Sequence, residues 1–256
     1  MKANYHTHSK YCGHASGEVE EYVKVAIERG IETLGFSCHV PYPFNNGYVS
    51  GYRIQLSDHE KYVNDVLNVR EKYGDRINIL LGYEAEYYPV HFDDMLSLIR
   101  KYPVDYLILG QHDSDNEYDG VTNHAPADDI ARVVKYADTL CTAMRTGLYT
   151  YVAHPSLITY NGSTDEYLEV MKRVCETSLE TDTPLELNLL GLSEERPYPK
   201  NSFFSLVGEM GCKVVVGCDA HSPDRVAKPW ELRRADEYIK KHGLNVVECV
   251  EIKKVK

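Results

Sequence analysis

Short apolar runs alternate with longer amphipathic segments along the whole chain. The runs are rich in β-branched residues and bounded by turn residues, which is typical of strands buried in a parallel sheet. Seven such strands are predicted, over residues 4–8, 33–39, 77–84, 105–112, 150–154, 185–188 and 213–219. Apolar positions that recur with a 3.6-residue period predict helices between them, over residues 18–29, 57–73, 91–100, 127–146, 165–180, 202–210 and 230–242.

This alternation predicts a single α/β domain over residues 1–256, with a parallel sheet that is either closed into a barrel or open and doubly wound. No Pro-rich or Ser-rich linker and no block of charge divides the chain. Three long irregular segments are expected directly after strand ends, where a barrel builds its binding site: residues 41–51, 115–126 and 190–201.

Charge and cysteine content narrow the class of protein further. The chain carries 28 Lys and Arg against 39 Asp and Glu, a net charge of −11, so a nucleic-acid partner is not expected. The N-terminal residues lack the apolar core of a secretory signal, and no run reaches the roughly 18–20 apolar residues of a membrane span. We therefore expect a cytoplasmic protein without a membrane partner. The seven cysteines are scattered and form no CxxC pair, which argues against a disulfide framework or a zinc ribbon.

Histidines and carboxylates gather at the predicted strand ends. His6 and His8 occupy alternate positions of the first strand, so both side chains point to one face and suit the chelation of one ion. The carboxyl ends of parallel strands lie on one face of the fold, and the other candidate ligands follow those ends: His14, His39, Glu84 or Glu86, His112, His154, Asp219 and His221. The remaining histidines are expected at the surface, with one of them, His124, able to overhang the site: His59, His91, His124 and His242.

This concentration of ligands predicts a metal cluster. A single buried histidine is more often a hydrogen-bonded core residue, but seven of the eleven histidines at strand ends, or in the loops just after them, favour a shared role. Imidazole and carboxylate ligands without a thiolate cluster suit zinc, iron or manganese. One ion takes roughly four to six ligands, so the candidate set implies two or three divalent ions.

The order and spacing of these residues resemble the polymerase-and-histidinol-phosphatase (PHP) family over nearly the whole chain. The resemblance is carried by these motifs: His6-Thr7-His8, His14, His39, Gly82-Tyr83-Glu84, His112, His154 and Asp219-Ala220-His221. Residues 11–17, 80–87 and 217–223 are similar to the histidinol-phosphate phosphatase branch. The resemblance implies a distorted (β/α)7 barrel of the TIM-like kind, which agrees with the seven predicted strands.

The resemblance also implies how the ions share their ligands. The first ion would be held by His6, His8, Glu84 and Asp219. Glu84 would bridge to a second ion, held by His112 and His154. A third ion would be held by His14, His39 and His221. Alternation places Glu84 and Glu86 on the same face of their strand, and only the resemblance favours Glu84.

The implied activity is metal-dependent hydrolysis of a phosphomonoester. The substrate would be L-histidinol phosphate and the products L-histidinol and phosphate, a step of histidine biosynthesis. A hydroxide bridging the first two ions would attack phosphorus, and Asp219, His39 or His221 would give the leaving alkoxide its proton. The alternatives are a PHP-type phosphatase or phosphodiesterase acting on another small phosphoester, and a metal-binding module without catalysis.

Binding of a phosphate group normally adds Arg or Lys side chains. Arg196 and Lys200, after the sixth strand, and Arg53, after the second, are the expected contacts, with solvated surface charge as the alternative for each. The chain departs from the histidinol-phosphate phosphatase branch directly after His154, where Pro-Ser-Leu stands in place of a basic residue. Two tyrosines of the same loops are candidates to line the substrate pocket: Tyr42 and Tyr198.

Overall fold

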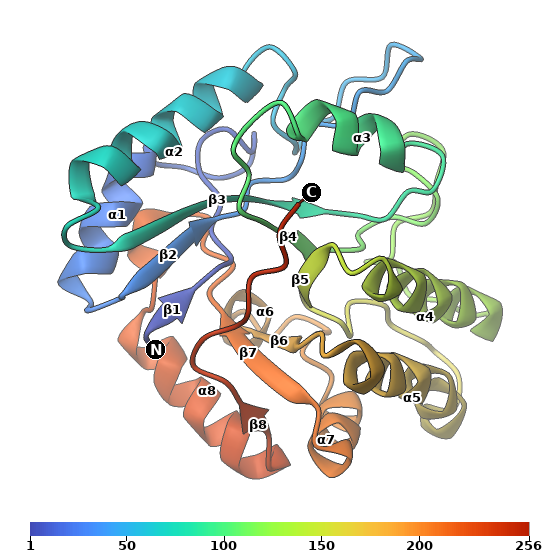
Figure 1. Cartoon of the computed structure of the whole chain (residues 1–256). Coiled ribbons are helices and arrows are strands. Elements are labelled where there is room, and N and C mark those ends of the chain that lie inside the picture. Colours follow the sequence, from blue (N-terminus) through green and yellow to red (C-terminus); the bar gives the residue numbers. More distant parts are fainter. Residues whose placement is uncertain (256) are drawn as a thin grey trace.

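Eight strands form one parallel sheet in the computed structural model, which describes residues 1–255. The strands follow one another across the sheet in the order of the sequence (Figure 1). Their bounds are β1 Ala3–Asn4, β2 Thr33–Phe36, β3 Asn78–Ala85, β4 Tyr106–Leu109, β5 Tyr149–Val152, β6 Leu185–Asn188, β7 Lys213–Gly217 and β8 Asn245–Val246. Because neighbouring strands are parallel, each connection has to cross back along the sheet.

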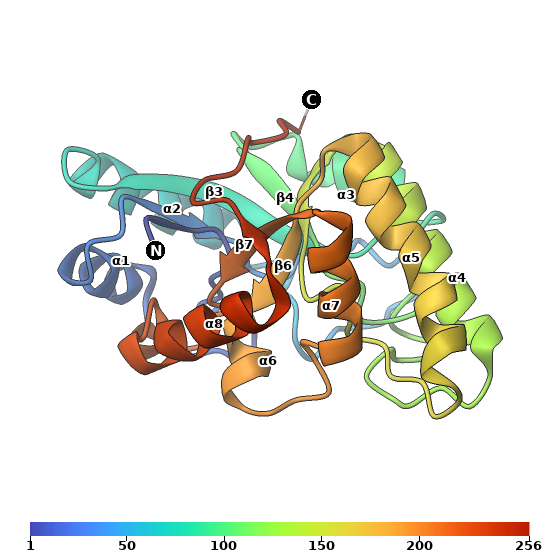
Figure 2. The ribbon, with the colours of Figure 1, turned by 90° about the horizontal axis from the view of Figure 1, so that it is seen from below.

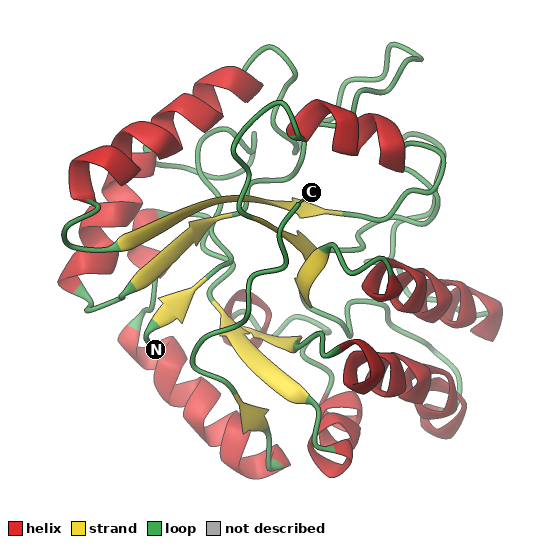
Figure 3. Ribbon diagram, viewed as in Figure 1, coloured by secondary structure: helices red, strands yellow, loops and turns green. Residues whose placement is uncertain are grey.

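Helices make most of these connections and cover the outer face of the sheet (Figures 2 and 3). They are α1 Val19–Glu28, α2 His59–Tyr73, α3 Phe92–Ile99, α4 Ile130–Arg145, α5 Thr164–Thr181, α6 Leu189–Ser193, α7 Asn201–Met210 and α8 Pro229–His242, with a 3-10 turn at Pro223–Arg225. Gly211 and Gly243 end α7 and α8 in the left-handed region, at φ +72° and +60°, which glycine adopts without strain. No helix within residues 1–255 has the length and apolar character that crossing a membrane requires.

Each of the seven predicted strands overlaps a strand of the structure, which also contains a strand and an α-helix that the pattern did not predict. β8 pairs with Lys213 and Val214 at the start of β7. The helix α6 occupies part of the segment expected to be irregular, and begins where the Asn188 side chain accepts a hydrogen bond from the Gly191 N–H. The prediction of seven strands therefore omits β8, because its two residues are too few to show a period.

The sheet is curled into a half-barrel whose two sides meet beyond the ends of β1 and β7. Among residues 1–255, no ladder joins β1 to β8. Instead, an isolated parallel bridge joins Thr7 to Ala220, and the His8 N–H donates to the Ala220 carbonyl at 2.9 Å. This contact places residues that follow β1 directly beside residues that follow β7.

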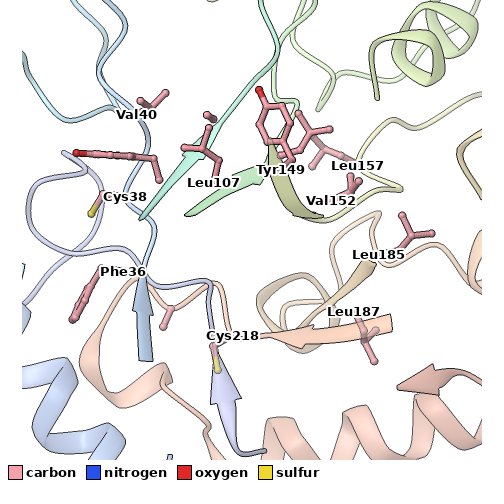
Figure 4. Close-up of a cluster of buried hydrophobic side chains, with 14 of the residues drawn as sticks. Phe36, Cys38, Val40, Leu107, Tyr149, Val152, Leu157, Leu185, Leu187 and Cys218 are labelled. Atoms are coloured by element: carbon pink, nitrogen blue, oxygen red, sulfur yellow. The ribbon is translucent and has the colours of Figure 1, made fainter. Parts of the chain in front are cut away.

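Side chains alternate between two cores along each strand. On β4, Leu107 packs into the larger core, which holds the buried side chains between the sheet and the helices (Figure 4). Its neighbour Tyr106 points the other way, into the curled sheet, where it contacts Tyr5 edge-on; Tyr151 does the same from β5. Val250 of the C-terminal segment covers this inner core. The inner space is thus filled by tyrosine rings and is a packed core rather than a channel.

The Tyr106 ring leaves no room for a side chain at Gly82 of β3. A Cβ at Gly82 would lie 2.3 Å from the Tyr106 ring, whereas a Cβ at the exposed Gly51 would meet nothing within 4 Å. We expect Gly82→Ala to lower the free energy of unfolding by about 1–3 kcal/mol, because the inner core has to shift to admit the methyl group. Urea denaturation measures this loss. Gly51→Ala is the control, and equal stability of the two variants would contradict the close packing.

Candidate metal centre

The nine predicted ligands come together at one end of the sheet. His6 and His8 follow β1, Glu84 belongs to β3, and the others follow strand ends or lie in the loops after them. An isolated bridge pairs His39 with Glu84, which continues the β2–β3 pairing into the site. Seven of the nine line one pocket: His14, His39, Glu84, His112, His154, Asp219 and His221. The other two, His6 and His8, are fully buried and contact the same carboxylates.

Glu84 lies at the centre of this group. Its side chain is 1% exposed, and nitrogen atoms of five histidines lie 2.9–3.4 Å from its two oxygens. Oε2 faces His6 Nε2, His8 Nε2 and His39 Nδ1. Oε1 faces His112 Nε2 and His154 Nε2. One carboxylate therefore touches two sets of histidines, one on each oxygen.

Asp219 forms the second centre of negative charge. Its Oδ1 lies 3.1 Å from His8 Nε2 and 3.4 Å from both His6 Nε2 and His221 Nδ1. His221 in turn approaches His14, with the two Nε2 atoms 2.8 Å apart. The backbone of Asp219 has φ +50°, an unfavourable conformation for a residue with a Cβ, and strain of this kind concentrates at functional sites.

The side chains of the group fit divalent metal ions. Four buried atoms lie where the histidines and Asp219 face one another, and they have no hydrogen-bond partner among the described residues. They are His6 Nε2, His8 Nε2, His39 Nδ1 and Asp219 Oδ1. Buried polar atoms are normally paired, so such a group requires a ligand. Burial raises the pKa of Glu84, but the histidines around it, His39 foremost, hold that pKa well below its usual range. An ionised carboxylate among histidine nitrogens is the donor set that zinc, iron and manganese take.

A second set of residues orients the histidines from behind. His6 Nδ1 lies 2.7 Å from a Glu186 oxygen, and His8 Nδ1 lies 3.3 Å from Cys12 Sγ. Each contact leaves the Nε2 atom of its ring free to face the group, as in metal sites where a ligand histidine donates its other N–H. Glu186 was not among the residues expected at the site, although its position between Leu185 and Leu187 of β6 was the available signal.

The ligands form the floor of a pocket of about 450 Å³. Its walls come from the long loops and include Tyr52, Asp113, Glu194 and Tyr198. Tyr198 was expected there, whereas the equally expected Tyr42 is buried and does not line this pocket. The pocket is open to solvent on one side of the cluster and is large enough for a small phosphorylated molecule.

The three basic residues expected at the phosphate have different positions. Arg196 lines the pocket and donates hydrogen bonds to the Tyr198 hydroxyl and the Glu194 carboxylate. Lys200 does not line the pocket, because its side chain turns away and the ammonium lies 4.3 Å from the Tyr167 ring centroid. Arg53 is 1% exposed and also does not line the pocket.

Of the four histidines expected at the surface, one is buried in the core and another, exposed, lies at the site. His59 is 2% exposed, and its Nε2 lies 2.6 Å from the Tyr83 hydroxyl, so it is a core residue of the α2–β3 contact. His124 lines the pocket and stacks on His112, with ring centroids 5.8 Å apart. The expectation of a surface residue is therefore wrong for His59, whereas His124 lies at the site as the alternative foresaw.

Comparison with known proteins agrees with this arrangement. A model of the PHP domain matches residues 4–189. The chain belongs to the PHP domain family. Relatives of this chain include a Deinococcus radiodurans protein described as a probable histidinol-phosphatase, 26% identical over 228 residues that make up 86% of each chain. A Schizosaccharomyces pombe protein of the same description is 24% identical over 98% of this chain and 90% of its own length.

The fold is shared with a solved structure. Histidinol phosphate phosphatase from Lactococcus lactis, crystallised with zinc, L-histidinol and phosphate, superposes with a TM-score of 0.74 at 19% identity, covering 99% of this chain and 98% of that chain. At that identity the likeness establishes a common α/β architecture over the whole length. The assignment of ligands in this chain depends on the geometry described above.

Metal removal should lower the stability of the protein. Ligands that bind only the folded state stabilise it by about 4 kcal/mol at 1,000 times the dissociation constant, which corresponds to roughly 10 °C in the melting temperature. We expect the melting temperature to fall by that order when a chelator strips the protein, and to recover when Zn²⁺ or Mn²⁺ is added. Glu84→Gln should lose most of this response. Identical melting curves with chelator and with metal would contradict the metal centre.

Proposed function

We propose that this PHP domain is a metal-dependent phosphomonoesterase that hydrolyses L-histidinol phosphate to L-histidinol and phosphate, in histidine biosynthesis. The observation that carries the proposal is the single carboxylate, Glu84, with histidine nitrogens on both oxygens at the floor of an open pocket. The descriptions of both relatives support this substrate. We also propose that the curled sheet is a distorted (β/α)7 barrel, with β8 as a short addition at its edge.

We assign two or three ions of zinc, manganese or iron to the cluster. The first would be held by His6, His8, Glu84 and Asp219, and the second by Glu84, His112 and His154; a third would be held by His14, His39 and His221. The distances support the first two groups, because Glu84 Oε2 faces His6 and His8 whereas Oε1 faces His112 and His154. The third group rests on the family resemblance, since His39 Nδ1 also lies 3.3 Å from Oε2. When bound, such ions supply Lewis acidity that lowers the pKa of water and offsets the negative charge of a phosphate.

The residues of the pocket divide the remaining work. Arg196 is the basic side chain available to donate to phosphate oxygens, since Lys200 and Arg53 do not line the pocket. The proton for the leaving alkoxide is assigned to Asp219, His39 or His221. The side chain of His221 is 22% exposed, against 6% for Asp219 and 5% for His39, so His221 is the most open to a substrate oxygen. In that role His221 would not hold a third ion, and the smaller count of two would apply.

Release of phosphate from a substrate panel tests the proposed reaction. The panel contains histidinol phosphate, a nucleoside monophosphate, a sugar phosphate and a phosphodiester, each with Zn²⁺, Mn²⁺ or Fe²⁺ and with a chelator control. We expect turnover of histidinol phosphate to exceed the others and to vanish with the chelator. Preference for another ester would leave the phosphatase activity in place but contradict histidinol phosphate as the substrate. Metal uptake without any turnover would favour a metal-binding module without catalysis.

Substitution of the central ligands should remove activity without unfolding the protein. We expect Glu84→Gln and His8→Ala to lower kcat by more than about 100-fold, because loss of a residue that merely supports a ligand already costs about 10- to 100-fold. Glu176→Gln, at an exposed position of α5, is the matched control and should retain full activity. Phosphate release and circular dichroism measure the two effects. Full activity in a folded Glu84→Gln protein would rule out the assignment.

A further inference from the structure

Two glutamates, Glu84 near the end of β3 and Glu86 directly after the strand, are two positions apart but have different partners. Glu84 faces five histidine nitrogens, whereas Glu86, which is fully buried, has one oxygen 2.7 Å from His112 Nδ1 and the other 2.7 Å from Arg53 Nη1. His112 therefore lies between the two carboxylates, with Nε2 toward Glu84 and Nδ1 toward Glu86. Strand alternation does not separate the two glutamates, so another contact must do so.

Arg53 is the residue that distinguishes them. Its guanidinium is buried, with Nε 2.6 Å from Glu117 and Nη2 2.8 Å from the Tyr52 hydroxyl, in addition to its contact with Glu86. The Tyr52 ring centroid also lies 4.7 Å from the guanidinium carbon. Because Arg53 is 1% exposed and lies outside the pocket, its guanidinium is not free to bind phosphate, unlike the part-exposed Arg196 that lines the pocket.

We propose that Arg53 is a positioning residue that holds the Glu86 carboxylate away from the metal ligands, so that Glu86 supports His112 and Glu84 alone enters the cluster. The proposal rests on the metal centre described above. It gives Arg53 a role that differs from the phosphate contact expected from the sequence.

The charges explain why the arginine matters for the metal. A buried carboxylate that loses its cationic partner is strongly unfavourable, and the closest remaining positive charge would be the ions two residues along the strand. A Glu86 side chain drawn toward them would leave His112 Nδ1 and compete with Glu84. Loss of a hydrogen bond behind a ligand histidine typically weakens metal binding by about 10- to 100-fold.

Titration of Zn²⁺ into metal-free protein tests the proposal without reference to activity. We expect Arg53→Met to weaken binding of the most weakly held ion by about 10- to 100-fold, while Glu117→Gln, which removes the other carboxylate partner of Arg53, stays within about threefold of the wild type. A purely structural role for Arg53 would lower the melting temperature and leave the Zn²⁺ affinity unchanged. That result would overturn the proposal.

The pair of variants at Arg53 and Glu86 sharpens the test. If Arg53 acts through the charge of Glu86, the arginine becomes dispensable once that charge is removed, since the amide oxygen introduced by Glu86→Gln still accepts from His112. We expect the Zn²⁺ affinity of Arg53→Met/Glu86→Gln to lie within about threefold of Glu86→Gln and above that of Arg53→Met. If Arg53→Met does not fold, this comparison decides alone. A double variant that binds Zn²⁺ far more weakly than Glu86→Gln, or does not fold, would overturn the proposal.

Kinetics separate positioning from phosphate binding. If Arg53 is a positioning residue, excess Zn²⁺ should restore kcat in Arg53→Met, and the KM for histidinol phosphate should be unchanged. If Arg53 instead binds the phosphate group of the substrate, Arg53→Met should have a raised KM even at full metal occupancy. That result would overturn the proposal. Failure of the proposed function is distinguishable from failure of this proposal. A wild-type protein that binds no Zn²⁺ would contradict the metal centre itself. A metal-loaded wild-type protein without turnover would contradict only the proposed reaction on histidinol phosphate.

Discussion

Burial of the Glu84 carboxylate among histidines is the constraint on which the rest of the site depends. An ionised carboxylate inside a protein requires compensation by positive charge, and five histidine nitrogens within 3.4 Å provide the setting for metal ions to supply it. The parallel sheet makes this possible, because β1 to β5 and β7 present these side chains at the same end. The bridge between Thr7 and Ala220 completes the arrangement by placing His8 beside Asp219.

The molecule separates this charged end from the part that provides its stability. Beneath the ligands, the tyrosine rings of the inner core fill the curled sheet, and the helices bury the outer face against the larger core. The polar residues that orient the ligands, such as Glu186, are themselves fully buried and paired. Substitutions at the pocket can therefore alter metal binding without removing much of the packed apolar surface.

Much of this arrangement was predictable from the sequence, because strands and helices leave different periods and strand ends are easy to locate. Eight of the nine candidate positions followed from that placement, while the choice of Glu84 over Glu86 came from the family resemblance. All nine side chains meet in the structure. The short elements β8 and α6 were not predictable. β8 has two residues and exists through its pairing with β7, while α6 depends on a cap from Asn188. The burial of His59 was missed because its partner, Tyr83, lies on another element.

The sequence by itself determined the class of fold and the types of residue that converge, since both depend on periodicity and on the common direction of parallel strands. Only the tertiary structure decided how equivalent residues divide their roles. Glu84, in β3, and Glu86, just after its end, are two positions apart and the same residue type, so nothing local separates them. Arg53 separates their roles from a loop that is distant in the sequence. It lies behind the ligands and out of the pocket, where it contacts Glu86, Glu117 and Tyr52. Contacts between elements leave no period in the sequence, and for that reason they appear only when the chain is folded.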